Sequence, residues 1–228
     1  MLRKIVSIIA LVIGLLLLAV WSPWQNWDLN ILELVGIETT QDFASLKVKS
    51  LAGEIEIFVD DELLGTANAE DVDFSEITPV SIGEHTIVLK RKDDADKYFV
   101  MTKKLNFEPG VDVVIAYDLG PNEYFSEGHV LFSRKNFSAA NDVLLNISVN
   151  PVAANIFVDG IQVGTAPLND IKLDVTKQHK LKFEKVGFDP LEITILPEKQ
   201  EDRDKLMGLT LDLEVNLFAQ PIKIQTAN

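Results

Sequence analysis

The chain of 228 residues contains no cysteine, and its acidic residues far outnumber its basic ones. The missing cysteine excludes disulfide bonds, thiolate metal sites, a cysteine nucleophile and a lipid-modified N-terminal cysteine. Export from the cytoplasm stays compatible with this composition, because an exported domain with enough core needs no disulfide. With 21 Lys and Arg against 35 Asp and Glu, the formal net charge is −14. We therefore expect no nucleic-acid partner, since nucleic-acid recognition needs a basic surface.

Residues suited to catalysis or metal binding are also scarce. The chain has only three histidines, at scattered positions, and no nucleophile motif. Acidic loops at 70–73, 93–96 and 201–204 raise the question of calcium, but none matches a known calcium-binding loop. We expect these loops to be solvated, and we predict no catalytic residues, no metal site, no cofactor and no enzyme activity.

Tryptophan is rare and confined to one place. Trp21, Trp24 and Trp27 are the three tryptophans of the chain, and they lie at and just after the end of a hydrophobic run at residues 5–21, which is mostly Ile, Leu, Val and Ala. Indole rings favour the interface between lipid and water. This arrangement indicates a membrane segment at residues 5–21 with the three tryptophans at its outer interface.

The hydrophobic run is typical of an uncleaved anchor. Its length is near the lower end of the roughly 17–25 residues that cross a bilayer. Arg3 and Lys4 precede it and keep the N-terminus in the cytoplasm. We expect residues 1–27 to form a single-pass anchor in the cell membrane, with the bulk of the chain outside the cytoplasm. A cleaved signal peptide is the alternative, although Pro23 would adjoin one of the candidate cleavage sites.

The rest of the chain repeats one short pattern. Ile57-Phe58-Val59-Asp60 leads to Gly65-Thr66-Ala67, and Ile156-Phe157-Val158-Asp159 leads to Gly164-Thr165-Ala166 with the same spacing. A repeat of this kind marks two copies of one small domain. Each copy indicates a strand, a tight turn and a second strand.

Five residues of the repeat are predicted to shape its turn. Asp60 and the pair Asp159-Gly160 stand at the hairpin tips, because Asp and Gly tolerate left-handed backbone and Asp bonds its own main chain. Gly65 and Gly164 are expected to matter for the conformation of the backbone. They are not expected to bind phosphate, since no helix follows them. All five are assigned a structural role.

Alternation of apolar and polar residues predicts many short strands. Frequent turns between such strands favour a sandwich. We therefore expect an all-β fold, with two tandem small β-sandwich modules behind one N-terminal transmembrane helix. Residues 128–133 indicate one more strand, which either closes the first module or bridges to the second. The expected divisions after the anchor are a stalk at 28–45, the first module at 46–122, a connector at 123–141, the second module at 142–220 and a tail at 221–228.

The second copy resembles the PEGA domain family. It contains a strand ending in Val158-Asp159-Gly160, then Gly164-Thr165-Ala166-Pro167-Leu168, then a strand from His179 and the pair Gly187-Phe188. The first copy departs from this pattern with Asp61 where Gly is usual. The resemblance implies small sandwich-like β modules, often in tandem behind a membrane segment, that bind proteins or envelope polymers and carry no catalytic residues.

His85 and His179 fall at matching places in the two copies. A metal or catalytic role needs partners, and neither copy shows a second histidine or a fixed carboxylate. We expect both histidines to be structural. His129, in the connector close to Glu127, is likewise not expected to act in catalysis or metal binding.

Two functions fit these observations. The first is an anchored extracytoplasmic protein that binds an envelope protein or a cell-wall polymer. The alternative is a structural spacer with no ligand of its own. A binding protein is expected to expose an aromatic or apolar patch, for which the candidates are Tyr98-Phe99, Tyr124-Phe125 and Phe188, whereas a spacer is expected to have polar faces. The oligomeric state does not follow from the sequence.

Overall fold

A computed structural model describes residues 43–136 and 142–221. These residues form strands in several sheets, with a single short α-helix in this part of the chain, so the expected all-β fold is confirmed. The predicted anchor at residues 1–27, with its tryptophans, lies outside the described residues. Within them, no helix is long and apolar enough to cross a membrane.

The first module pairs its strands into two sheets. One sheet has the order β3-β2-β5-β6, and all of its strands are antiparallel. In the other, β1 is antiparallel to β4 and parallel to β7. The strands are β1 (Phe43–Ser50), β2 (Glu54–Val59), β3 (Glu62–Asn68), β4 (Ser75–Ser81), β5 (Gly83–Arg91), β6 (Met101–Phe107) and β7 (Asp112–Asp118), with the 3-10 helix η2 (Ala95–Lys97) between β5 and β6.

The second module repeats these pairings strand for strand. Its small sheet has the order β11-β10-β13-β14, while β9 is antiparallel to β12 and parallel to β15. The sequence repeat is therefore a repeat of the fold. The strands are β9 (Val143–Asn150), β10 (Asn155–Val158), β11 (Ile161–Thr165), β12 (Leu168–Leu173), β13 (His179–Glu184), β14 (Leu191–Ile195) and β15 (Leu209–Asn216), with helix α3 (Gln200–Asp204) before β15.

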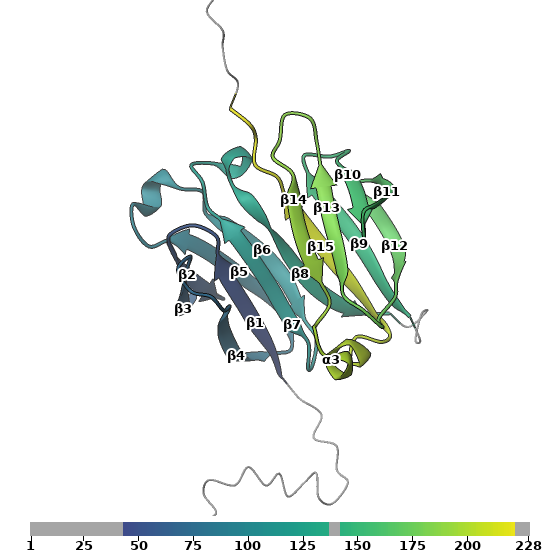
Figure 1. Ribbon diagram of the computed structural model, residues 1–228. Coiled ribbons are helices and arrows are strands. Elements are labelled where there is room, and N and C mark those ends of the chain that lie inside the picture. Colours follow the sequence, from purple (N-terminus) through teal and green to yellow (C-terminus); the bar gives the residue numbers. More distant parts are fainter. Residues whose placement is uncertain (1–42, 137–141, 222–228) are drawn as a thin grey trace, which may run out of the picture. The chain divides into compact units, whose positions relative to one another are not determined.

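One further strand joins the two modules. β8 (Glu127–Lys135) follows the 3-10 helix η3 (Glu123–Phe125) and lies within the stretch expected to be a connector. It pairs antiparallel with β7 on one side and with β15 on the other. The result is a seven-stranded sheet in the order β12-β9-β15-β8-β7-β1-β4, which runs through both modules (Figure 1).

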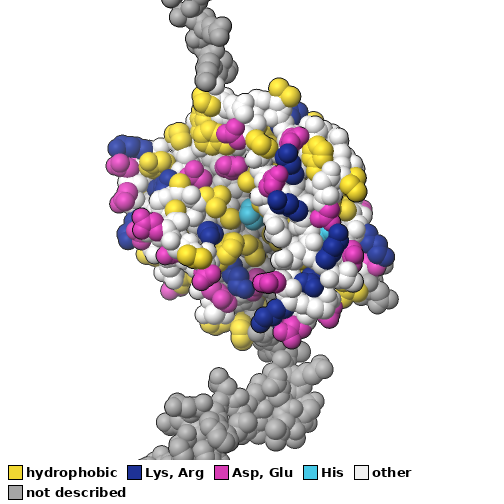
Figure 2. Space-filling model, in the orientation of Figure 1, with side chains coloured by type: hydrophobic (Ala, Val, Ile, Leu, Met, Phe, Trp, Pro, Cys, Tyr) yellow, Lys and Arg dark blue, Asp and Glu magenta, His cyan; other side chains and the backbone are white. Residues whose placement is uncertain are grey.

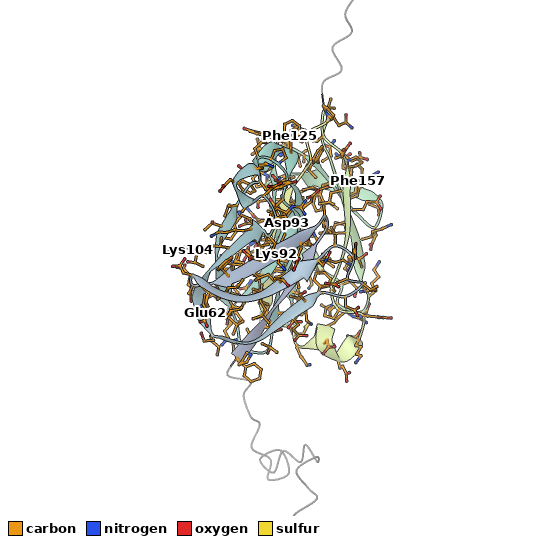
Figure 3. The ribbon with its side chains drawn as sticks, turned by 90° about the vertical axis from the view of Figure 1, so that its left-hand side faces the viewer. Glu62, Lys92, Asp93, Lys104, Phe125 and Phe157 are labelled. Carbon is orange, nitrogen blue, oxygen red and sulfur yellow. The ribbon has the colours of Figure 1, made fainter. Side chains whose placement is uncertain are left out.

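The two hydrophobic cores lie on opposite faces of this seven-stranded sheet. Successive side chains of a strand point to opposite faces. On β8, Val130 and Phe132 pack against the core of the first module, whereas Leu131 packs against the core of the second. Figure 3 shows the same arrangement, because Glu62 of the first small sheet and Phe157 of the second appear on opposite sides.

Matching apolar residues fill the two cores. Ile57 and Ile156, from the repeated strand, are fully buried, as are Leu89 and Phe183, which pair with them across the small sheets. Burying such a side chain stabilises the fold by roughly 1.5–3 kcal/mol. Each small sheet is therefore held onto the large sheet by the inward positions of its central strands.

Gly128 allows β8 to approach β7. A Cβ atom at this position would lie 2.3 Å from the Ala116 carbonyl oxygen and 2.6 Å from the Tyr117 ring. We predict that Gly128→Ala lowers the free energy of unfolding by about 1–3 kcal/mol, because overpacking against a backbone cannot be relieved by a rotamer change. Urea unfolding followed by circular dichroism measures this loss. Gly65→Ala is the matched control, since its Cβ meets only Ile77 at 3.7 Å, and a loss as large as that of Gly128→Ala would contradict the explanation.

His129 makes the joint between the modules sensitive to acid. Burial lowers the pKa of this imidazole from its ordinary value of 6.5 to about 4. Because the folded pKa is lower, the unfolded chain binds more protons between pH 6.5 and 4, so stability falls as the pH falls through that window. We expect a loss of roughly 2 kcal/mol from pH 7 to pH 5, measured by urea unfolding, and its absence in His129→Gln. Equal pH dependence in the two proteins would show that His129 is not responsible.

Candidate functional site

The repeated motif forms a two-residue turn at the tip of each β2–β3 or β10–β11 hairpin. Asp60 and Asp61 have φ angles of 48° and 69°, and Asp159 and Gly160 have φ angles of 50° and 82°. Positive φ at both central residues is the requirement of a type I′ turn. The pairing register shifts immediately before Gly65 and before its counterpart in the second copy, which indicates a β-bulge in both hairpins.

In the first module, the turn aspartate binds the start of β5. The Asp60 carboxylate lies 2.5 Å from Nδ1 of His85 and accepts a hydrogen bond from the Thr86 amide at 2.8 Å. Nε2 of the same ring lies 3.0 Å from the Ser81 hydroxyl and 2.9 Å from the Ser81 carbonyl oxygen. We call this arrangement the Asp–His clasp, because it ties the hairpin tip to the turn between β4 and β5.

The second module contains the same clasp with one more donor. Asp159 lies 3.0 Å from Nδ1 of His179, and it accepts hydrogen bonds from the Lys180 amide at 3.0 Å and the Lys177 ammonium at 2.6 Å. Nε2 of His179 lies 2.9 Å from the Asp174 carbonyl oxygen. Both ring nitrogens of His179 thus lie within hydrogen-bonding distance of an oxygen atom.

The clasp corrects the expectation that neither histidine has a fixed carboxylate. The partners were missed because Asp60 precedes His85 by 25 residues and Asp159 precedes His179 by 20. Ser81, His85 and Asp60 contact one another in the order hydroxyl, imidazole, carboxylate, as in the Ser-His-Asp triad of hydrolases. The second copy, however, retains the Asp–His pair with a main-chain carbonyl in place of the serine hydroxyl. The arrangement is therefore best explained as a structural tie.

Hydrogen bonds favour the ionised form of the clasp aspartates, so these carboxylates stabilise the fold as anions. The Thr86 amide and then His85 hold the pKa of Asp60 below its usual value, and Lys177, followed by the Lys180 amide, has the same effect on Asp159. A carboxylate with a lowered folded pKa stabilises the fold above its unfolded pKa of about 3.9, and this contribution is lost as the pH falls below that value.

We predict that Asp60→Asn lowers the thermal unfolding midpoint at pH 7, and that its difference from the wild type shrinks below pH 4. Asp159→Asn is expected to have a larger effect, since it also removes the partner of Lys177. Asp61→Asn is the matched control, because Asp61 stands in the same turn and takes part in no ion pair among the described residues. A midpoint lowered equally by Asp61→Asn would contradict a specific role of the clasp. Calorimetry across this pH range makes the comparison.

A hollow of about 330 Å³ lies where the two modules meet. We call it the junction hollow. One wall comes from the first module, with Phe99 before β6 and Met101 on it, and Val130 of β8 also lines the hollow. The opposite wall is the face of the large sheet in the second module, and it includes Ser148 on β9 and Asn216 on β15. A space lined by both modules depends on the sheet that joins them.

Polar groups are fixed around the junction hollow. Lys103 of β6 donates a hydrogen bond to Glu214 of β15 at 2.5 Å, which ties the two walls together. Asn150 donates to Asn216 at 2.8 Å, and Asn216 donates to the carbonyl oxygens of Glu123 and Ser126 at 2.8 and 2.6 Å. These bonds hold side-chain amides and an ion pair next to apolar walls.

Two further groups define the chemistry of the hollow. Burial raises the pKa of the Tyr117 phenol well above its usual range, and the carboxylates of Glu123 and Glu214 act in the same direction, so this group remains neutral. The hydroxyl of Ser148 is exposed within the hollow. Mixed apolar and hydrogen-bonding walls of this kind are typical of sites that orient a small group by a few polar contacts.

The aromatic residues proposed as contacts are mostly packed. Phe99 packs against the first core and Phe188 against the second. Phe125 contacts Phe218, with ring centroids 5.7 Å apart, and Tyr98 lies under the Arg91 guanidinium at 4.8 Å. Among these five, Tyr124 is the most exposed, at 63%, and it adjoins Glu123 of the junction hollow, which Phe99 also lines.

Residues 43–136 and 142–221 contain no group of three or more histidine or acidic side chains placed to hold a metal ion. Comparison with models of known protein families finds no match to this chain, and no curated protein matches it.

Proposed function

We propose that the chain is a membrane-anchored, extracytoplasmic protein of two PEGA-like modules that binds an envelope protein or cell-wall polymer and has no catalytic activity. The hydrophobic run at residues 5–21 supports the anchor. The repeated hairpin motif supports the family. The junction hollow is the observation that favours binding, because it combines apolar walls with hydrogen-bonded side-chain amides and the exposed Ser148.

The surface supports binding over a purely structural spacer. A spacer is expected to have polar faces, whereas exposed large apolar side chains occur at several positions of both modules. Figure 2 shows hydrophobic side chains gathered near the middle of one face, with carboxylates and basic groups around them. Isolated apolar side chains are common on protein surfaces, so the junction hollow remains the stronger argument.

The test is retention of envelope material on the full chain, immobilised in detergent micelles. Purified envelope polymer and solubilised envelope proteins are applied separately, because these two fractions distinguish the two partner classes. We predict specific retention from one of them, and at least about a tenfold loss with Ser148→Trp, since an indole fills the junction hollow. Thr194→Trp is the matched control, because Thr194 is an exposed strand residue of β14 that does not line the hollow.

Three outcomes are decisive for this proposal. Retention that survives Ser148→Trp would move the binding site away from the junction hollow. Equal loss with Thr194→Trp would indicate a general effect of an added indole. No retention of either fraction would favour the spacer.

A further inference from the structure

The two modules differ in the connection that follows their hairpins. In the second module, Ala166 and Pro167 alone separate β11 from β12. In the first module, residues 69–74 separate β3 from β4. We call β3, this loop and β4 the β3–β4 side. Since the second module folds with two connecting residues, the longer loop of the first is not required by the fold.

The β3–β4 side is bordered by carboxylates that form no ion pair among the described residues. Residues 50–89 contain ten acidic residues and no Lys or Arg, whereas the equivalent residues 149–183 contain three acidic and four basic ones. The strand pairing of Leu89 with Ile57, and of Phe183 with Ile156, fixes this equivalence. Six exposed carboxylates on and beside this side form no ion pair with any described residue: Asp61, Glu62, Glu70, Asp71, Asp73 and Glu76.

Apolar side chains are exposed between these carboxylates. Val72 is 86% exposed and Leu63 is 51% exposed, and Leu64 and Phe74 are also exposed. β3 and β4 lie against each other here, since the backbone at Gly65 approaches the Ile77 side chain. The loop itself alternates acidic and apolar residues from position 71 to 74. Figure 3 shows Glu62 pointing outward at this edge of the small sheet.

The loop is held in place before any partner arrives. The Lys49 ammonium donates a hydrogen bond to the Val72 carbonyl oxygen at 2.8 Å and lies over the Phe74 ring at 5.9 Å. The Asn68 amide donates to the Asp71 carboxylate at 3.2 Å. A preorganised surface loses less conformational freedom on binding.

We propose that the β3–β4 side binds a protein segment rich in lysine or arginine whose charges alternate with apolar side chains. The unpaired carboxylates attract and orient the positive charges, and the exposed Val72 and Leu63 receive the apolar ones. Anionic lipid headgroups and nucleic acid are repelled by the same carboxylates. This surface is separate from the junction hollow and does not depend on it.

A second copy of the chain is a weaker candidate for this surface. Most lysines of the second module are already paired with its own acidic residues, as in Lys177 with Asp159 and Lys180 with Glu192. Lys172 and Lys182 also form ion pairs within their own module. A partner copy would have to break these pairs, whereas a free cationic segment would not.

The test uses the full chain in nonionic detergent and a labelled peptide of about ten residues that alternates lysine and valine. Fluorescence anisotropy measures its binding. We predict saturable binding that weakens with added salt, and at least about a tenfold loss with the double substitution Glu62→Lys and Asp73→Lys. A peptide alternating glutamate and valine is not expected to bind.

Matched variants separate a specific surface from general charge. The double substitution Asp93→Lys and Asp96→Lys makes the same charge change in the β5–β6 loop of the same module, where both side chains are exposed. It is expected to change affinity less than about twofold. Val72→Ser is expected to weaken binding several-fold, whereas Val186→Ser, at a 98% exposed position of the second module, is expected to leave it unchanged.

Three results would overturn the proposal. The first is no binding of the lysine–valine peptide, and the second is an equal loss with the control double substitution. The third is self-association of the chain, seen by sedimentation, that Glu62→Lys with Asp73→Lys abolishes, because this would make a second copy the occupant. Ser148→Trp leaves the β3–β4 side intact. The peptide test of the β3–β4 side and the retention test of the junction hollow can therefore fail or succeed independently.

Discussion

The pairing of β8 with both β7 and β15 is the interaction on which the rest of the structure depends. This strand supplies Val130 to one core and Leu131 to the other, so each module relies on it for part of its hydrophobic packing. Because it is hydrogen-bonded on both sides, it places strands of the two modules in one sheet. The junction hollow follows directly, since residues of β6 and of β9, from the two modules that β8 joins, line it together.

Most core strands were predictable from the sequence, because one of their faces is buried and the other is solvated. β2 and β9 show this alternation clearly. Edge strands β4 and β12 gave no such signal, since few of their side chains are buried. β8 was ambiguous for the opposite reason. Its consecutive apolar residues at 130–132 lack alternation because cores cover both faces of the sheet at this strand.

The turn residues were predictable, and the sites built from distant segments were not. Asp60 and Asp159 follow from the chemistry of tight turns, whereas their pairing with His85 and His179 spans segments of different length in the two copies. That difference reflects the longer β3–β4 connection, so aligning the two copies around this loop would have revealed the shared pairs. The junction hollow requires the order of strands in the large sheet, which no local pattern contains. In the sequence, the β3–β4 side could be recognised only as an acidic loop. Its apolar residues could not be distinguished from core residues, because their exposure depends on the fold.

Through its pairings with β7 and β15, β8 is expected to make the two modules one cooperative unit. Native-state hydrogen exchange of the full chain in increasing urea tests it most directly, by comparing the opening free energies of the amides in β2 and β10. These strands belong to different small sheets and share no pairing. We expect both sets to exchange through the same global opening, with equal free energies and equal urea dependence. Different opening free energies, with one small sheet exchanging while the other stays protected, would contradict it.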